Sequence, residues 1–352
     1  MLASRHGATH AVAMCNATIA LQLLLRALGA AGEVILPSFT FIATAHAARW
    51  ENLTTRFADI ATDTHCIDPA AVAEAVGPDT AAIIGVNLWG QACEVEPLGR
   101  IASGSGIPLL LDAAQALGSQ LGPQLRAEAV ASGALAAVIS LHATKIVSGL
   151  EGGAILTNDG ALAEDLRLRR NFGFAGYDNV VSLGTNAKMD EFSAAFAIRG
   201  LECLDGLMER NRAIGRLYQE NLADLSGLSV HAPKRSPTSN HHYSVLMVDG
   251  AQCPLTRDEL MHTLWAENIL ARRYFFPGCH RMEPYASQPA VGQAPLPCTD
   301  AVAAGVLVLP ASSAVDMEDV PLICERIRCA LQQHEQVRER LYGSVTTGVP
   351  HP

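Results

Sequence analysis

Lysine chemistry is possible at few places in this sequence. Lysines occur only at positions 145, 188 and 234 of the 352 residues. Lys145 lies in VISLHATKIVSGLEGGAIL, which predicts a strand, a polar turn and a Gly-rich return into a second strand. An isolated lysine is most often a solvated surface residue. Here the flanks are small and apolar, and Ser140, His142 and Thr144 directly precede it, so Lys145 is our candidate for amine chemistry.

Two further positions could bind charged groups. Asp112 directly follows the apolar run IPLLL, although an aspartate there could equally be a helix N-cap. Asn16, Ala17 and Thr18 open a predicted helix. The free N–H groups and positive dipole end of a helix N-terminus can hold a phosphate, but Asn and Thr also serve there simply as caps.

The elements that must position these residues alternate along the chain. Helical spacing of apolar residues predicts helices over Thr18–Leu28, 44–49 and 68–76, the last with Asp68 as N-cap. Short apolar runs predict strands over 33–37, 56–59, 81–88 and 107–111. Nearly continuous apolar strands between helices are typical of a parallel sheet covered on both faces, where ligands gather at the carboxyl ends of the strands. The fold class is therefore predicted to be α/β.

The alternation changes near residue 200. A long helical pattern over 190–222 leads into a region with its own strand, 243–248, and its own helix, 257–267. We predict a large domain over 1–205 and a smaller C-terminal α/β domain over 206–352.

Composition excludes several classes of protein. Apolar residues make up 49% and charged residues 17%, which is sufficient for a large core. The net charge of −10 argues against a surface for nucleic acid or anionic membranes. Neither a signal peptide nor a membrane-spanning run is evident, so we expect a cytoplasmic protein. Nine scattered cysteines without a CxxC pair indicate neither a disulfide framework nor a metal site.

Several blocks together resemble one family, the sugar aminotransferases of the DegT/DnrJ/EryC1/StrS type, which are pyridoxal-phosphate (PLP) enzymes of fold type I. The blocks follow the family's order across nearly the whole chain: HAVAMCNATIALQLLLRALG, VILPSFTFIATAHA, VNLWGQ, LLLDAAQALGS, SLHATKIVSGLEGGAILTND, GTNAKMDEFSAA and ENILARRYFFPGCHRMEPY. The family usually carries some tens of residues before the first block, whereas about ten precede it here. If that segment is missing, the resemblance implies lower stability or activity.

The resemblance implies a role for each matching position. Lys145 matches the lysine that forms a Schiff base with PLP and later moves a proton. Asp112 matches the carboxylate beside the pyridine nitrogen, and Gln115 the residue near the phenolic oxygen. The other cofactor-binding positions are Ala17, Thr18 and Ser140 for the phosphate, Phe41 for stacking on the ring, and Asn186, which reaches the phosphate of a neighbouring subunit and so implies a homodimer.

The substrate side is also given by the resemblance. Trp89 matches an aromatic residue near the sugar, with a core tryptophan as the alternative. Arg272, Arg273, Tyr274, His280 and Tyr285 form a cationic and aromatic group suited to a nucleotide diphosphate and a sugar ring, with a solvated basic face as the alternative.

The activity implied is transfer of an amino group from L-glutamate to a nucleotide-linked keto-deoxysugar. The C-terminal stretch looks most like enzymes that aminate dTDP-4-keto-6-deoxyglucose at C4, and similar enzymes act at C3. A sugar dehydratase of the same scaffold has His in place of the lysine, which disfavours that alternative. A catalytically silent regulator or sugar-binding protein would not need Lys145 together with Asp112.

Overall fold

The computed structural model describes residues 1–119, 133–232 and 239–343. These fall into two compact units. Unit 1 consists of the described residues of Met1–Glu209, Pro233–His242 and Pro277–Asp300, and unit 2 of those of Arg210–Ala232, Tyr243–Phe276 and Ala301–Pro352. The first change of unit lies four residues after the predicted boundary at 205. The later segments that return to unit 1 differ from the predicted continuous C-terminal domain, because they bond to strand ends of unit 1.

Unit 1 is built on a seven-stranded sheet with the order β1-β7-β6-β5-β4-β2-β3. Its strands are β1 (His10–Met14), β2 (Glu33–Pro37), β3 (Thr54–Ala58), β4 (Thr80–Val86), β5 (Leu109–Asp112), β6 (Ala134–Ser140) and β7 (Gly153–Thr157). Strands β3, β2, β4, β5 and β6 pair in parallel, and β7 runs antiparallel to both β6 and β1. All strands except β7 therefore point the same way, which confirms the predicted α/β class with a mostly parallel sheet.

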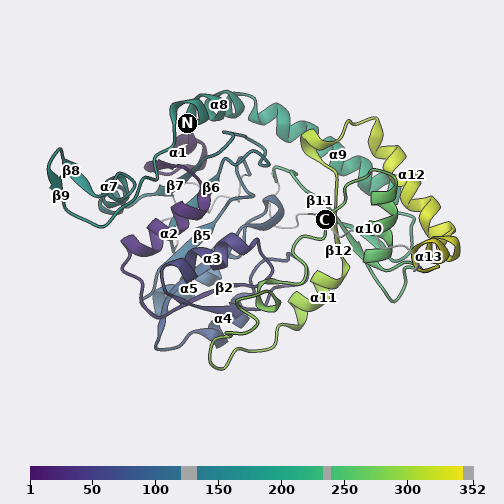
Figure 1. Ribbon diagram of the computed structural model, residues 1–352, viewed down its shortest axis with the longest axis horizontal. Helices are drawn as coiled ribbons and strands as arrows, with labels where there is room; N and C mark the ends of the chain where they lie inside the picture. Colours follow the sequence, from purple (N-terminus) through teal and green to yellow (C-terminus); the bar gives the residue numbers. More distant parts are fainter. Residues whose placement is uncertain (120–132, 233–238, 344–352) are drawn as a thin grey trace. The chain divides into compact units, whose positions relative to one another are not determined.

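Helices cover both faces of this sheet (Figure 1). One group contains α2 (Ala17–Ala27), α3 (Ile42–Trp50) and α7 (Gly160–Arg169), and a second group α4 (Pro69–Ala75) and α5 (Val95–Gly104). Side chains alternate along the strands: Leu36 and Ile84 join the core under the first group, and their neighbours Ile35 and Ile83 are also fully buried. Both faces are thus apolar, as the continuous apolar runs predict.

The remaining elements of unit 1 are short or lie beyond the sheet. They are α1 (Leu2–His6), the 3-10 turns η1 (Leu88–Gly90) and η3 (Cys279–Arg281), the hairpin strands β8 (Phe174–Gly176) and β9 (Asn179–Val180), and α8 (Glu191–Glu202). The hairpin follows α7 at the left edge of Figure 1. The helix predicted over 190–222 is divided at Cys203, where α8 ends and α9 (Leu204–Leu222) begins.

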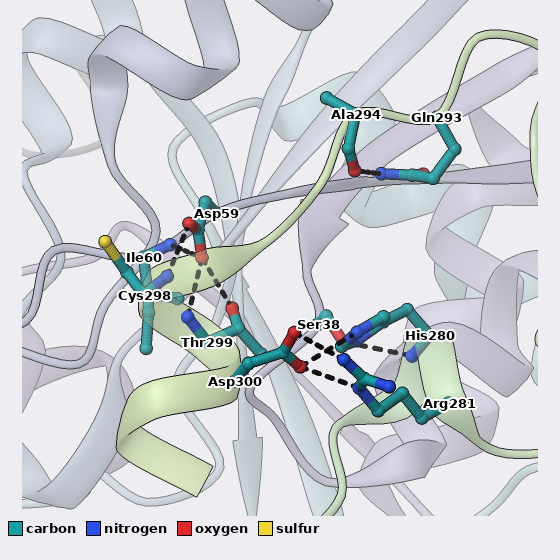
Figure 2. Close-up of polar contacts among 10 residues, drawn as sticks. All are labelled: Ser38, Asp59, Ile60, His280, Arg281, Gln293, Ala294, Cys298, Thr299 and Asp300. Carbon is teal, nitrogen blue, oxygen red and sulfur yellow. Dashed lines mark hydrogen bonds and ion pairs between the residues drawn. The ribbon is translucent and has the colours of Figure 1, made fainter.

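Residues 277–300 cover the sheet at its β3 edge. The Gln293 side chain accepts the Phe57 N–H at 2.9 Å and donates to the Phe57 carbonyl at 2.8 Å, so it replaces a neighbouring strand. The Asp59 carboxylate accepts the N–H groups of Cys298 and Thr299 (Figure 2). An edge strand left open would invite pairing with other chains, and these bonds protect it.

Unit 2 contains a three-stranded antiparallel sheet, β10-β11-β12. Its elements are β10 (Leu228–His231), β11 (Ser244–Val248), α10 (Arg257–Ala266), β12 (Val306–Leu309), the 3-10 turn η4 (Ser312–Ala314), α12 (Asp319–Gln332) and α13 (His334–Tyr342), with α9 and α11 (Pro297–Gly305) crossing the unit limits. Thr256 and Glu259 form a capping box that starts α10. Within the described residues, no helix is long and apolar enough to cross a membrane.

Candidate active site

The carboxyl ends of the parallel strands bring the predicted cofactor residues to one edge of the sheet. Asp112 is the last residue of β5 and Ser140 the last of β6, and the two strands are neighbours. Phe41 follows β2, and Ala17 follows β1. Ligands bind at such edges in open α/β sheets.

Asp112 is held in a buried, hydrogen-bonded position. Its side chain is 7% exposed, Thr44 Oγ1 donates to Oδ2 at 2.8 Å, and the Ala114 N–H donates to Oδ1 at 3.1 Å. Burial raises the pKa of the Asp112 carboxyl, and Thr44, Ala114 and the Lys145 charge oppose that rise. The residues after Asp112 form turns, so it is not the N-cap of a helix.

Lys145 lies in the turn between β6 and β7, as predicted. Its N–H donates to the His142 carbonyl at 2.9 Å, which tightens the turn. Burial lowers the pKa of the Lys145 amine, and the Asp112 carboxylate opposes this. A lowered pKa increases the fraction of uncharged amine, which is the nucleophilic form. Lys145 thus lies close enough to Asp112 for their charges to interact, and burial favours its uncharged form.

Ala17 and Thr18 lie close to the strand end that carries Ser140. Ala17 and Thr18 form the first turn of α2, and the Asn16 cap accepts the Ile19 N–H at 2.8 Å. Gly153 is in register with both Met14 and Ser140, and a Cβ there would lie 2.7 Å from the Ala17 nitrogen. Only glycine permits this approach of the β7 start, which pairs with Ser140, to the start of α2, and a helix start near a hydroxyl suits a bound phosphate.

These residues fit PLP. The lysine, the carboxylate and the helix start meet at one edge, and the Gly153 contact keeps the helix start close to Ser140. Phe41, the predicted stacking residue, lies at the N-cap of α3 with 58% of its side chain exposed. Among the described residues there is no cluster of three metal-ligating side chains.

Gln115 is oriented by a backbone group. Its Oε1 accepts the Trp89 N–H at 3.0 Å, and the side chain is 8% exposed. This bond fixes which end of the amide carries the oxygen and turns the Nε2 donors the other way.

Trp89 is buried in unit 1, as the alternative of a core tryptophan predicts. Its side chain is 1% exposed, its Nε1 donates to His65 Nδ1 at 3.1 Å, and Phe39 packs edge-on at 6.2 Å. The neighbouring Gly90 has a φ of +79°, and a Cβ there would lie 2.3 Å from Asn240 Oδ1. The close approach and the burial of the indole favour the alternative of a core tryptophan.

The predicted cationic and aromatic group is divided between the units. Arg272, Arg273 and Tyr274 belong to unit 2, and His280 and Tyr285 to unit 1. Arg273 is engaged within unit 2, where its guanidinium lies 3.1 Å from Asp258 and 4.7 Å from the Phe276 ring centroid. Arg272 is exposed, and its backbone exchanges hydrogen bonds with Val308. Tyr274 stacks on Phe275.

Tyr285 and His280 use their polar atoms inside unit 1. Tyr285 is 2% exposed, bonds His46 Nδ1 at 2.7 Å and packs in the core of unit 1, which favours a structural role. His280 Nδ1 lies 2.7 Å from Ser38 Oγ and its Nε2 3.3 Å from Asp300 Oδ1 (Figure 2). It also lines a cavity of about 530 Å³ with Arg281.

Asn186 lies exposed at an isolated bridge with Asn171. The nearby Lys188 donates to Asn171 Oδ1 at 3.0 Å and lies over the Phe172 ring. It is therefore a surface charge, and we do not assign it the role predicted for Lys145. Lys234 falls outside the described residues.

Sequence reasoning missed three residues of this edge: Thr44, Asn240 and His242. Thr44 could have been found from the sequence, because it is a hydroxyl residue in the first turn of the helix that follows FTF. Asn240 and His242 precede a strand of the other unit, and no local pattern connects them to Lys145.

Comparisons with known proteins identify the family of this chain. The model of the DegT/DnrJ/EryC1/StrS aminotransferase family matches residues 1–328. A dTDP-4-amino-4,6-dideoxy-D-glucose transaminase of Shigella dysenteriae is 34% identical over 316 residues, which cover 89% of this chain and 83% of the relative.

Solved structures give the same assignment. DesI, crystallised in the presence of its TDP-sugar product, is 43% identical with a TM-score of 0.90 over 97% of this chain and 85% of that one. DesV of S. venezuelae, in complex with a ketimine intermediate, is 29% identical with a TM-score of 0.84 over 94% of this chain and 87% of that one. This chain belongs to the DegT/DnrJ/EryC1/StrS family of PLP-dependent aminotransferases.

Proposed function

We propose that this enzyme transfers an amino group from L-glutamate to C4 of a nucleotide-linked keto-deoxysugar, with dTDP-4-keto-6-deoxyglucose as the substrate. The observation that carries the proposal is the pairing of Lys145 with Asp112 beside the start of α2. The names of the relatives support the sugar: transaminases of Shigella dysenteriae and Escherichia coli are named for dTDP-4-amino-4,6-dideoxy-D-glucose, and DesI was solved with a TDP-sugar product.

Each residue has a task in this reaction. PLP, when bound, supplies an electron sink for the carbon that loses a proton. Lys145 holds the cofactor and moves that proton through its amine. Asp112, as a carboxylate, keeps the pyridine nitrogen protonated, and its bonds from Thr44 and Ala114 favour the charged form against burial. The α2 start and Ser140 hold the phosphate, and Gln115 presents its amide donors to the phenolic oxygen.

Phe41 has an exposed ring that supports stacking on the cofactor. For the nucleotide, Arg272 and Tyr274 of unit 2 and His280 of unit 1 stay candidates. Arg273 is the weaker candidate, because Asp258 and Phe276 already engage it.

A homodimer is part of the proposal. The chain exposes an unusual number of large apolar side chains over β8, β9 and α8: Phe172, Phe174, Tyr177, Val180, Val181, Leu183, Phe192, Phe196 and Ile198. Exposed apolar surface of this kind marks protein interfaces. Asn186 is exposed in the same stretch, which supports its reaching a cofactor phosphate in a second copy. Nine free cysteines support a reducing compartment, so we propose the cytoplasm.

The test combines the enzyme with PLP, L-glutamate and dTDP-4-keto-6-deoxyglucose, and follows 2-oxoglutarate and the aminated sugar. Formation of both, with nitrogen located at C4 by NMR, is the expected result, and Lys145→Ala is the control. Nitrogen at C3 of a 3-keto sugar would identify the alternative activity. No turnover with either sugar would favour a silent sugar-binding or regulatory protein, a possibility raised by the relative named erythromycin biosynthesis sensory transduction protein EryC1.

A further inference from the structure

Residues 239–242 lie far from Asp112 and Lys145 in sequence but belong to the same unit. Ser239 and Asn240 are fully buried, and Tyr243, the next residue after His242, already belongs to unit 2. A buried segment must satisfy all of its polar groups. The segment Ser239–His242 bonds to the turns that follow β5 and β6.

Asn240 holds the turn after β5. Its Nδ2 donates to the carbonyls of Gln115 at 2.8 Å and Leu117 at 3.0 Å, and its N–H donates to Ser119 Oγ at 3.1 Å. These carbonyls lie in a turn, where no ladder or helix bond satisfies them. One side chain therefore fixes the backbone on both sides of Ala116, four residues after Asp112.

His242 holds the turn after β6. Its Nε2 lies 2.8 Å from the carbonyl oxygen of Thr144, the residue before Lys145. A carbonyl only accepts hydrogen bonds, so Nε2 carries the proton. Burial, with a smaller contribution from the Lys145 charge, lowers the pKa of His242 to about 4 against the opposing effect of the Thr144 carbonyl. The imidazole is therefore neutral at neutral pH, and the Lys145 amine faces no added positive charge from it.

The two residues are connected to each other. The His242 N–H donates to Asn240 Oδ1 at 3.1 Å. Hydrogen bonds thus run from the Gln115–Ser119 turn through Asn240 and His242 to Thr144. The chain of bonds joins the turn that follows Asp112 to the backbone next to Lys145.

Resting on the proposed function, we propose that Asn240 and His242 are positioning residues, which set the place of the Lys145 amine relative to Asp112. Neither touches the reacting atoms by this account. Their effect passes through the Thr144 carbonyl and the Gln115 and Leu117 carbonyls, so a side chain that preserves the donor should preserve the effect.

The experiment compares His242→Gln with His242→Leu in the PLP-loaded enzyme. A glutamine Nε2 can take the place of the imidazole Nε2 donor, whereas leucine fills the space without a donor. We expect His242→Leu to lower kcat about tenfold or more, because the loss of a hydrogen bond and a small misplacement of the amine each slow the reaction by about that factor. The KM for the sugar should stay within about threefold of the wild-type value. We expect the pH midpoint of the visible PLP band to shift as well. His242→Gln should restore both readouts.

His334→Leu is the matched control, because His334 Nδ1 also lies 3.1 Å from a backbone carbonyl, that of Leu331 in unit 2. It should keep the wild-type kcat and midpoint. If His242→Leu fails to fold, His242→Asn replaces it, since the shorter amide does not reach Thr144. Asn240→Asp, which replaces the donor to two carbonyls by an acceptor, should lower kcat in the same way.

A wild-type kcat and an unmoved midpoint in His242→Leu would overturn the inference. Equal losses in His242→Gln and His242→Leu would also overturn it, because the ring and not its bond to Thr144 would then be required. A wild-type protein that forms no visible band with PLP would count against the proposed function. A normal wild-type band with no difference among the variants counts against this inference alone.

Discussion

Two regions of unit 1 use polar side chains in different ways. At the ends of β5 and β6, buried polar groups are arranged around Asp112 and Lys145, and burial disfavours the charge of each. In residues 277–300, polar groups attach one segment to β2 and β3: His280 bonds Ser38, and Gln293 bonds Phe57. The first region tunes reactive groups and the second closes a sheet edge, although both contain histidine and acidic residues.

The largest expected effect concerns Lys145. Lys145→Ala should lower amino transfer at least about a thousandfold, because Lys188, the other lysine among the described residues, is engaged by Asn171. Lys145→Arg should fail as well, since a guanidinium keeps the charge but is not a nucleophile at neutral pH. Product formation over single and multiple turnovers measures both. Activity in Lys145→Arg would mean that only a positive charge is needed there.

Asp112→Asn and Asp300→Asn sharpen the comparison, since each removes one carboxylate charge from one region. Asp112→Asn should lower kcat roughly a hundredfold, the size expected for a group that stabilises developing charge. Asp300 bonds Arg281 and His280, so Asp300→Asn should change kcat less than about threefold and mainly lower stability. Steady-state kinetics of both variants measures the two effects on kcat. Similar losses of kcat in the two variants would contradict the distinction between the regions.

Sequence reasoning worked best where chemistry follows directly from a strand. Asp112, Ser140 and Lys145 lie where their local patterns put them, and the apolar runs gave the parallel sheet. It worked poorly for aromatic and basic residues. Trp89 and Tyr285 look the same in sequence whether they face a ligand or the core, and only the contacts of His65 and His46 decide. Asn240 and His242 could not be found, because their bonds reach turns more than 90 residues away in sequence.

The pH dependence of stability should reveal His242. Its pKa in the folded state is about 4, against 6.5 for the free side chain. Between these values the unfolded chain binds a proton that the folded chain does not, so stability is lost as pH falls from about 6.5 towards 4. The loss should reach at most about 3 kcal/mol and should be absent in His242→Gln. Urea unfolding at a series of pH values measures the stability of the wild type and of His242→Gln. The same pH dependence of stability in both proteins would contradict a neutral His242 in the folded state.

The smallest expected effect is that of Tyr285→Phe. This change removes only the hydroxyl that bonds His46, so it should cost about 1 kcal/mol of stability and leave the KM for the sugar unchanged within about twofold. Thermal unfolding measures the change in stability, and steady-state kinetics measures the KM for the sugar. A tenfold rise in KM would place Tyr285 at the substrate after all and would contradict its core role.

The most direct test of the account is to find which lysine binds PLP. The protein is incubated with PLP, reduced with borohydride so that the bond to the amine becomes permanent, digested and analysed by mass spectrometry. With lysines only at positions 145, 188 and 234, the peptide map is unambiguous. We expect the added mass on Lys145 alone, and its removal by prior treatment with L-glutamate. A label on Lys188 or Lys234, or no label at all, would contradict the assignment of Lys145 as the cofactor lysine.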